Sequence, residues 1–319
     1  MKTGAKTNDQ LRGISFMKKY GAYCLRLFLI AALLVLFFPQ DSYAKKKTID
    51  VIVFAGQSNM MGHGNAAEAT NVSSKAAKAY LPVTAAGKIS AFYEPFGQLE
   101  NDKYFNSVFG KENYATGSLV SSFIKNYYEQ TKTPVLAVPA AMMGSGSQSW
   151  ASDRYKGIIS RVNAAEKAAR KAGYSIGHVY MVWMQGESDA LAMQRNTDGS
   201  CDNNMSGKQH IKNVKKMLSK VQKKTDITKC FVIVIPSYYG ADTDPYGTKW
   251  SVYYKKIQQA QVTLCNENDD FIMAYSKTPS LGREYFHADN MHLMQPGLNK
   301  IGLAAGKTVG KYAKKHKNS

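Results

Sequence analysis

Short apolar runs alternate with amphipathic segments along most of the chain. Some runs are apolar at nearly every position, which is typical of strands buried on both faces: 49–54, 134–139, 178–184, 230–236 and 271–275. Segments in which apolar residues recur at helical spacing lie between or after them, at 116–129, 153–172, 208–224, 250–265 and 299–311. Strands that alternate with helices are typical of a parallel sheet covered on both faces. We therefore predict an α/β fold, a three-layer α/β/α sandwich with a mostly parallel sheet, and a further short strand within 88–93.

The first apolar run ends at a glycine-bounded turn that carries a serine, Gly56-Gln57-Ser58-Asn59-Met60. At the carboxyl edge of a parallel sheet, a helix that follows a strand offers free backbone N–H groups, which can stabilise a developing anion. Ser58 is therefore a candidate nucleophile. The alternative is an ordinary strand-to-helix turn in which Ser58 caps the helix.

An acid and a histidine lie three positions apart far downstream, as Asp289 and His292, just ahead of a helical segment. A serine hydroxyl becomes a good nucleophile when an imidazole accepts its proton and a carboxylate orients that imidazole. The catalytic residues would then follow the order Ser58, Asp289, His292. His287 is a weaker candidate base, because Glu284 lies three positions before it in place of an aspartate.

The other histidines are less suited to this role by their positions. His178 precedes a strand, His210 lies on a basic helix, and His316 is in the C-terminal tail. His63 follows Ser58 by only five residues, so we expect it to line the pocket at most.

Three stretches of this chain resemble the signature blocks of the sialate O-acetylesterase and acetylxylan esterase branch of the SGNH hydrolases: GQSNM at 56–60, WMQGESD at 183–189 and DNMH at 289–292. The resemblance runs from about residue 49 to about residue 312 and implies a flavodoxin-like SGNH hydrolase fold. It also implies a serine esterase that removes O-acetyl groups from glycans such as sialic acid, with no metal and no organic cofactor. Met60 excludes the Gly-x-Ser-x-Gly turn of the α/β-hydrolases, which has glycine at that position.

The same resemblance implies an oxyanion hole. Its donors would be the backbone N–H groups of Ser58 and Gly117 and the side-chain amide of Gln185, since a glutamine can donate to an oxyanion without carrying charge. The family usually has proline after the glycine, whereas this chain has Ser118.

Further residues near these blocks are predicted to contact substrate: Gln57, Asn59, Ser145 and Glu187. Ser145 lies in a Gly/Ser-rich loop, 142–150, which lacks the Gly-Lys-Ser/Thr ending of a phosphate-binding loop, so we predict no nucleotide binding. The pattern leaves three interpretations for Glu187 and Asp189. They could orient the loop, compete with Asp289 as partner of the histidine, or cap nearby N–H groups.

Residues 63–116 are rich in aromatic and amide side chains. This mixture suits the apolar faces and hydroxyl edges of sugar rings, so the segment could form one wall of a substrate cleft. The same mixture also occurs in a loop that packs on a small core of its own.

The N-terminal segment has the pattern of a secretory signal. Lys18 and Lys19 precede an apolar stretch over 21–39, which leads to the small-residue site Ser42-Tyr43-Ala44. We predict a signal peptide over 1–44, whose true start could be Met17, and a single secreted or periplasmic esterase domain over 45–319 without stable membrane insertion. The alternative is an uncleaved membrane anchor, because the apolar stretch approaches spanning length.

The chain is strongly basic, with a net charge of +19, and cleavage after Ala44 would leave 36 basic and 21 acidic residues, or +15. Such a charge favours acidic partners. The lysines are scattered without a recognisable nucleic-acid module, so we predict no nucleic-acid partner. The charge fits an acidic O-acetylated glycan better than neutral xylan. A cell-wall polymer or xylan O-acetylesterase, and an inactive glycan-binding protein with the same fold, are the alternatives.

Three cysteines lie beyond the predicted signal, Cys201, Cys230 and Cys265. They allow one disulfide at most, and none is spaced for a metal site. The sequence predicts neither the pairing nor an oligomeric state.

Overall fold

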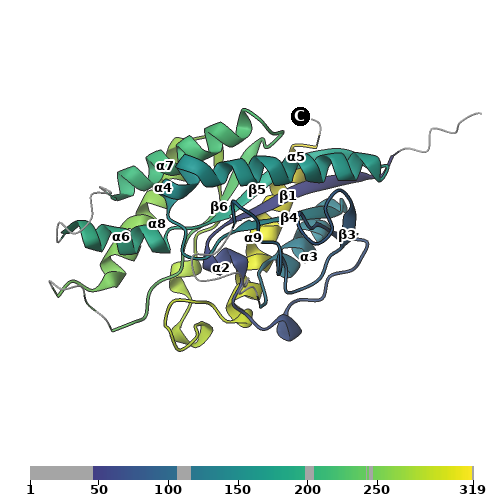
Figure 1. Cartoon of the computed structure of the whole chain (residues 1–319). Coiled ribbons are helices and arrows are strands. Elements are labelled where there is room, and N and C mark those ends of the chain that lie inside the picture. The colour runs from purple at the N-terminus through teal and green to yellow at the C-terminus, as the bar shows by residue number, and fades with distance from the viewer. Residues whose placement is uncertain (1–45, 106–115, 198–204, 242, 244–246, 318–319) are drawn as a thin grey trace, which may run out of the picture. The chain divides into compact units, whose positions relative to one another are not determined.

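A seven-stranded sheet lies at the centre of the described part of the chain (Figure 1). The strands are β1 (Thr48–Gly56), β2 (Ala77–Tyr80), β3 (Ile89–Ala91), β4 (Val135–Ala141), β5 (Ser175–Met184), β6 (Lys229–Ile233) and β7 (Phe271–Tyr275). Their order is β3-β2-β4-β1-β5-β6-β7, and every pair is parallel except β2 and β3. The computed structural model describes residues 46–105, 116–197, 205–241, 243 and 247–317. The predicted α/β fold with a mostly parallel sheet is confirmed.

Helices cover both faces of this sheet. They are α2 (Ser58–Met61), α3 (Val120–Thr131), α4 (Ser147–Ser149), α5 (Tyr155–Lys171), α6 (Glu187–Thr197), α7 (Gly207–Gln222), α8 (Trp250–Glu267) and α9 (Gln295–Lys315). Figure 1 shows α5 and α7 on one side of the strands and α3 and α9 on the other.

The central strand β1 explains this three-layer arrangement. Its side chains alternate between two cores, because successive residues of a strand point to opposite faces. Val51 and Val53 pack with apolar residues of α5 and α7, whereas Ile52 and Phe54 pack with those of α3 and α9. A strand that carries apolar side chains on both faces therefore requires a helical layer on each side.

The strand β2 and the helix α6 were not predicted from the sequence. β2 joins the sheet beside β4, within the segment that we expected to be mostly loop. α6 begins at Glu187, so most of the block 185–189 that follows β5 is the first turn of a helix. Glu187 and Asp189 suit that turn, since carboxylates are favoured near the positive end of a helix dipole.

Helix α3 begins later than predicted, at Val120, and Thr116 is not its N-cap. The Thr116 hydroxyl instead donates to the carbonyl oxygen of Gly64 at 2.7 Å. The carboxylate of Glu94 accepts the backbone N–H groups of Ser118 and Ser121, at 3.1 and 3.3 Å. A side chain distant in sequence therefore satisfies the start of α3, which no local pattern indicates.

The predicted signal peptide and Cys201 lie outside the described residues. The compact unit that carries the sheet is Lys47–Ser319. Cys230 and Cys265 both have free thiols. Among the helices that the structure describes, none has the length and apolar composition needed to cross a membrane.

Helices α3 and α9 approach each other closely because small residues of α9 face α3. A Cβ atom on Gly306 would lie 2.1 Å from the carbonyl oxygen of Phe123, and one on Gly302 would lie 2.3 Å from that of Leu119. Backbone atoms of α3 occupy these positions, so neither glycine can be replaced without moving one helix.

We expect Gly306→Ala to lower the free energy of unfolding by about 1–3 kcal/mol, the usual range for overpacking. The clash with Phe123 should outweigh the roughly 1 kcal/mol that alanine gains over glycine within a helix. Urea unfolding followed by circular dichroism measures this change. Lys307→Ala, at the exposed neighbouring position, is the control and should leave the stability nearly unchanged. Equal stability of Gly306→Ala and the control would contradict the packing argument.

Candidate active site

The turn after β1 presents Ser58 at the carboxyl edge of the sheet, between β4 and β5. Gly56 ends the strand with φ of +145°, and a Cβ atom there would lie 2.0 Å from the carbonyl oxygen of Met184. Only glycine fits this conformation and this contact. Gln57 occupies the N-cap position and Ser58 is the first residue of α2, so Ser58 is not the cap. As a first-turn residue, Ser58 has no partner for its N–H within the helix.

Ser58, His292 and Asp289 form a line of hydrogen bonds. Ser58 Oγ lies 3.0 Å from Nε2 of His292, and Nδ1 of the same ring lies 2.7 Å from Oδ2 of Asp289. Both distances are in the normal range. The structure thus brings together the three predicted catalytic residues, in an arrangement in which the imidazole can accept the serine proton while the carboxylate holds its other nitrogen.

Asp289 also fixes the backbone around the histidine. Its Oδ1 accepts the N–H groups of Met291 and His292, both at 2.9 Å. Partial burial alone would raise the pKa of Asp289, but these two N–H groups and the His292 imidazole outweigh burial and lower its pKa to about 2. Asp289 therefore remains ionised throughout the neutral and mildly acidic range.

His292 lies in a tight hairpin between β7 and α9. The N–H of His287 donates to the carbonyl oxygen of His292 at 2.9 Å, and Phe286 and Leu293 form an isolated antiparallel bridge. Nε2 of His287 contacts the carbonyl oxygen of His63 at 2.8 Å. The structure therefore pairs His292 with Ser58, and His287 supports the hairpin instead.

His63 stacks on His292, which sequence reasoning did not anticipate. The ring centroids are 4.1 Å apart and the planes are inclined by 21°. Burial, and then the neighbouring His292, lower the pKa of His63 to about 4, so its ring is neutral at physiological pH. The stacking depends on the hairpin folding back over the nucleophile turn, and no local sequence signal reports that contact.

Gly117 lies beside the chain that follows the nucleophile turn. Its carbonyl oxygen accepts the N–H of Gly64 at 3.0 Å, and the N–H of Thr116 donates to the carbonyl oxygen of Gly62 at 3.2 Å. A Cβ atom on Gly62 would lie 2.2 Å from the carbonyl oxygen of Gly117. The structure thus brings Gly117 next to α2, and its N–H as an oxyanion donor stays a prediction.

The side chain of Gln185 is buried and bonded within the protein. Its Nε2 donates to the carbonyl oxygen of Ser145 at 3.0 Å and to Oε1 of Gln57 at 3.3 Å. Both N–H groups of the amide therefore already have acceptors. Donation to an oxyanion would require one of these bonds to be exchanged, so this role of Gln185 stays a prediction.

The four predicted substrate contacts are also buried. Gln57 Oε1 accepts the N–H groups of Gly186 and Ser188, both at 3.2 Å. Ser145 Oγ donates to the carbonyl oxygen of Met142 at 2.7 Å and accepts from Trp150 Nε1 at 2.8 Å. This burial favours a supporting role for Gln57 and Ser145 over the substrate contact that we expected. Asn59 and Glu187 bond to each other.

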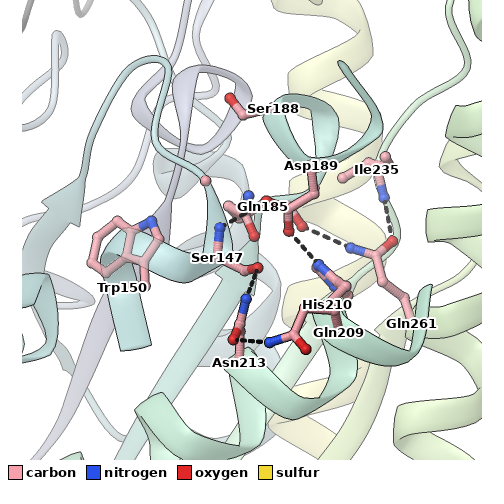
Figure 2. Close-up of polar contacts among 12 residues, drawn as sticks. Ser147, Trp150, Gln185, Ser188, Asp189, Gln209, His210, Asn213, Ile235 and Gln261 are labelled. Atoms are coloured by element: carbon pink, nitrogen blue, oxygen red, sulfur yellow. Dashed lines mark hydrogen bonds and ion pairs between the residues drawn. The ribbon is translucent and has the colours of Figure 1, made fainter. Parts of the chain in front are cut away.

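Asp189 is part of a second buried polar cluster, which joins the starts of α4 and α6 to α7 (Figure 2). Its Oδ1 accepts the N–H of Ser147 at 2.8 Å, and its Oδ2 lies 2.6 Å from Nδ1 of His210. Asn213 Nδ2 donates to Ser147 Oγ at 3.0 Å. Of the three interpretations for Asp189, capping of nearby N–H groups agrees with the structure. His210 is 0% exposed and not part of the basic surface of α7, which corrects its sequence-based placement.

The aromatic residues before α3 mostly pack inward. Tyr80, Phe96 and Phe105 are buried, whereas Tyr93 is exposed. Of the two interpretations of residues 63–116, the described part therefore agrees better with a loop packed on a core. Within the described residues, no group of three or more His, Cys, Asp or Glu side chains is placed to hold a metal ion.

The lowered pKa of Asp289 makes a prediction about pH-dependent stability. The folded state lowers the pKa of this carboxyl from 3.8 to about 2, so the ionised carboxylate stabilises the fold at any pH above 3.8. This stabilisation is lost as the pH falls toward about 2. The melting temperature of the wild type should therefore exceed that of Asp289→Asn at pH 6, and the gap should narrow on acidification. Since the side chain is 48% exposed, the gap will be modest. A gap that widens on acidification would contradict this assignment.

This chain is similar to a known protein family and to solved structures. The family described as carbohydrate esterase, sialic acid-specific acetylesterase matches residues 48–309. A structure from Arabidopsis thaliana is 18% identical, with 84% of this chain and 98% of that chain covered and a TM-score of 0.56. NanS is 13% identical, with 85% and 98% covered and a TM-score of 0.49. A carbohydrate acetylesterase from Xanthomonas citri is 14% identical, with 82% and 57% covered and a TM-score of 0.47.

A comparison with curated protein sequences gave no significant match. The likeness to the Arabidopsis structure agrees with the fold described above. The family match spans nearly all of the sheet and its helices, including the turn of Ser58 and the hairpin of His292. This chain belongs to the sialic acid-specific acetylesterase family of carbohydrate esterases and is a carboxylic ester hydrolase.

Proposed function

We propose that this protein removes O-acetyl groups from sialic acid, or from a similar acidic saccharide, through an acetyl-serine intermediate. The observation that carries the proposal is the line of hydrogen bonds from Ser58 through His292 to Asp289, in a chain of an acetylesterase family. The family supports an O-acetylated carbohydrate as substrate. The positive charge of the chain supports an acidic one.

In the proposed mechanism, Nε2 of His292 takes the proton of Ser58 as Oγ attacks the acetyl carbonyl carbon. Asp289 stabilises the imidazolium that forms. The oxyanion is held by the N–H groups of Ser58 and Gly117, with the amide of Gln185 as a third candidate donor. Loss of one such donor typically slows turnover by about 10²- to 10³-fold.

Collapse of the tetrahedral intermediate breaks the bond between the carbonyl carbon and the sugar oxygen. His292 returns its proton to that oxygen, and the sugar leaves as an alcohol. A water molecule then gives a proton to His292 and attacks the acetyl-serine, which releases acetate and restores the Ser58 hydroxyl. Each proton taken up by His292 is thus returned within the cycle, and the chemistry proposed requires no metal or organic cofactor.

We also propose that the mature protein is secreted or periplasmic. The proposal rests on the charged start, apolar stretch and small-residue site within residues 1–44. Such a location would give the enzyme access to glycans outside the cytoplasm. N-terminal sequencing of protein recovered from its native host tests the expected cleavage after Ala44, and an N-terminus that retains residues 21–39 would contradict it.

Acetate release from defined substrates tests the proposed function. Wild-type protein should release acetate from p-nitrophenyl acetate and from O-acetylated sialic acid, and Ser58→Ala should lower the rate at least about 10³-fold, since the nucleophile is lost. Ser152→Ala, which changes an exposed serine in the same domain, is the matched control. Faster acetate release from acetylated xylan or peptidoglycan would identify that polymer as the substrate in place of sialic acid. No release from any of them would contradict the esterase and favour a glycan-binding protein.

Asp289→Asn should lower kcat about 10²- to 10⁴-fold, because an amide that donates to Nδ1 holds the imidazole in the wrong tautomer and no longer supplies the charge that stabilises its protonated form. The measurement is steady-state kinetics with p-nitrophenyl acetate. Asp153→Asn removes a carboxylate from an exposed ion pair with Lys156 and serves as the control. Equal kcat values for the two variants would show that Asp289 does not assist His292.

A further inference from the structure

The residue after the nucleophile is bonded to the backbone on both sides of the catalytic histidine. Oδ1 of Asn59 accepts the N–H of Leu293 at 3.0 Å, and Nδ2 donates to the carbonyl oxygen of Met291 at 3.3 Å. Asn59 is 0% exposed, so its amide has no water to replace a lost partner. The peptide groups before and after His292 are thus held by the residue adjacent to Ser58.

The second N–H of the Asn59 amide is held by Glu187, at the start of α6. Nδ2 of Asn59 donates to Oε1 of Glu187 at 2.9 Å, and Glu187 is 1% exposed. Among the described residues, Oε2 of Glu187 is buried with no hydrogen-bond partner. A buried carboxyl is costly unless it is hydrogen-bonded, and the bond to Asn59 is the largest contribution that offsets the burial of Glu187, ahead of backbone N–H groups at 186 and 187. Burial raises the pKa of Glu187.

These bonds close a ring around the reacting atoms. The ring runs from Ser58 to Asn59 along the backbone, crosses the Asn59 amide to the backbone of His292, and returns through the imidazole to Ser58 Oγ, 3.0 Å from Nε2. The His292 hairpin is partly exposed, and Asp289 at its tip is 48% exposed on its side chain. The hydrogen bonds from Asn59 are therefore the buried contacts that attach the hairpin to the turn of Ser58.

We propose that Asn59 and Glu187 are positioning residues that set the separation of Ser58 and His292, and that neither contacts substrate. The inference rests on the proposed function of that site. Asn59 acts on the histidine through its backbone, and Glu187 acts through Asn59 by fixing the orientation of its amide. A displacement of about 1 Å between reacting groups can lower turnover about 10²-fold. Such a displacement alters the chemical step and leaves ground-state binding of the ester nearly unchanged.

The alternative role for Glu187 is electrostatic, as a second carboxylate that stabilises the imidazolium. The two roles differ in what a glutamine can replace. A glutamine at this position would keep an oxygen to accept from Asn59 but would carry no charge. The positioning role therefore predicts that Glu187→Gln recovers most of the activity that Glu187→Ala loses, whereas the electrostatic role predicts equal losses.

The test measures kcat and KM with p-nitrophenyl acetate, together with the rate at which a fluorophosphonate labels Ser58, in the full-length protein. Asn59→Ala should lower kcat and the labelling rate about 10- to 100-fold, with KM within about threefold of the wild type. Asn59→Asp keeps the acceptor for Leu293 but loses both donated bonds, so it should show the same pattern and covers the case in which Asn59→Ala fails to fold. Glu187→Ala should lower kcat about tenfold, and Glu187→Gln should lose less than Glu187→Ala.

A matched control separates positioning from general stability. Asn126 Nδ2 donates to the carbonyl oxygen of Leu303 at 2.8 Å and joins α3 to α9, away from the site. Asn126→Ala also deletes a side-chain-to-backbone hydrogen bond, so its melting temperature should fall while its kcat stays at the wild-type value. An Asn59 variant that folds and matches the kcat of Asn126→Ala would overturn the proposal, as would a rise in KM with unchanged kcat. Equal losses for Glu187→Gln and Glu187→Ala would overturn the assignment of Glu187.

The readouts distinguish this inference from the proposed function. Wild-type protein that releases acetate in a Ser58-dependent manner, with Asn59 variants equally active, would contradict the positioning role alone. Wild-type protein that releases no acetate from any ester would contradict the proposed function. The labelling rate of Ser58 would still report whether Asn59 sets the contact with His292.

Discussion

The hydrogen bond between Ser58 and His292 is the constraint on which the rest of the site depends. It joins two side chains that are 234 residues apart in sequence, so no local structure can set its length. The sheet supplies one half by ending β1 at Gly56, where only glycine fits against Met184. The hairpin between β7 and α9 supplies the other half. The Asn59 amide joins these two halves, and further polar contacts surround the turn that carries Ser58.

Most of these contacts are buried and bonded within the protein. Gln57 accepts N–H groups from the chain that follows β5, and Asp189 joins the loop of Ser147 to His210 of α7. In a low-dielectric interior, satisfied polar groups of this kind hold their geometry more rigidly than exposed ones do. Catalysis by preorganised dipoles needs such rigidity, because the groups must not rearrange when charge develops. The buried network therefore helps to keep the catalytic groups in fixed positions.

The sequence predicted those features that depend on chain order, and it missed those that depend on contacts between distant segments. Periodicity predicted the apolar strands and the parallel sheet. Three short motifs predicted the catalytic residues Ser58, Asp289 and His292. The buried pair of Asp189 and His210 did not, because a histidine among lysines on α7 looks exposed until the helix packs on the loop of Ser147. The substrate contacts predicted for Gln57 and Ser145 likewise took no account of burial, which only the folded chain determines.

Activation of Ser58 by His292 should produce an acetyl-enzyme during turnover. The most direct test is to mix the protein with p-nitrophenyl acetate, quench with acid before turnover is complete, and locate the acetyl group by peptide mass spectrometry. We expect an acetyl group on Ser58 in the wild type and little or none in His292→Ala over the same interval. Acetylation of another residue, or of Ser58 to the same extent in both proteins, would contradict the catalytic role assigned to this pair.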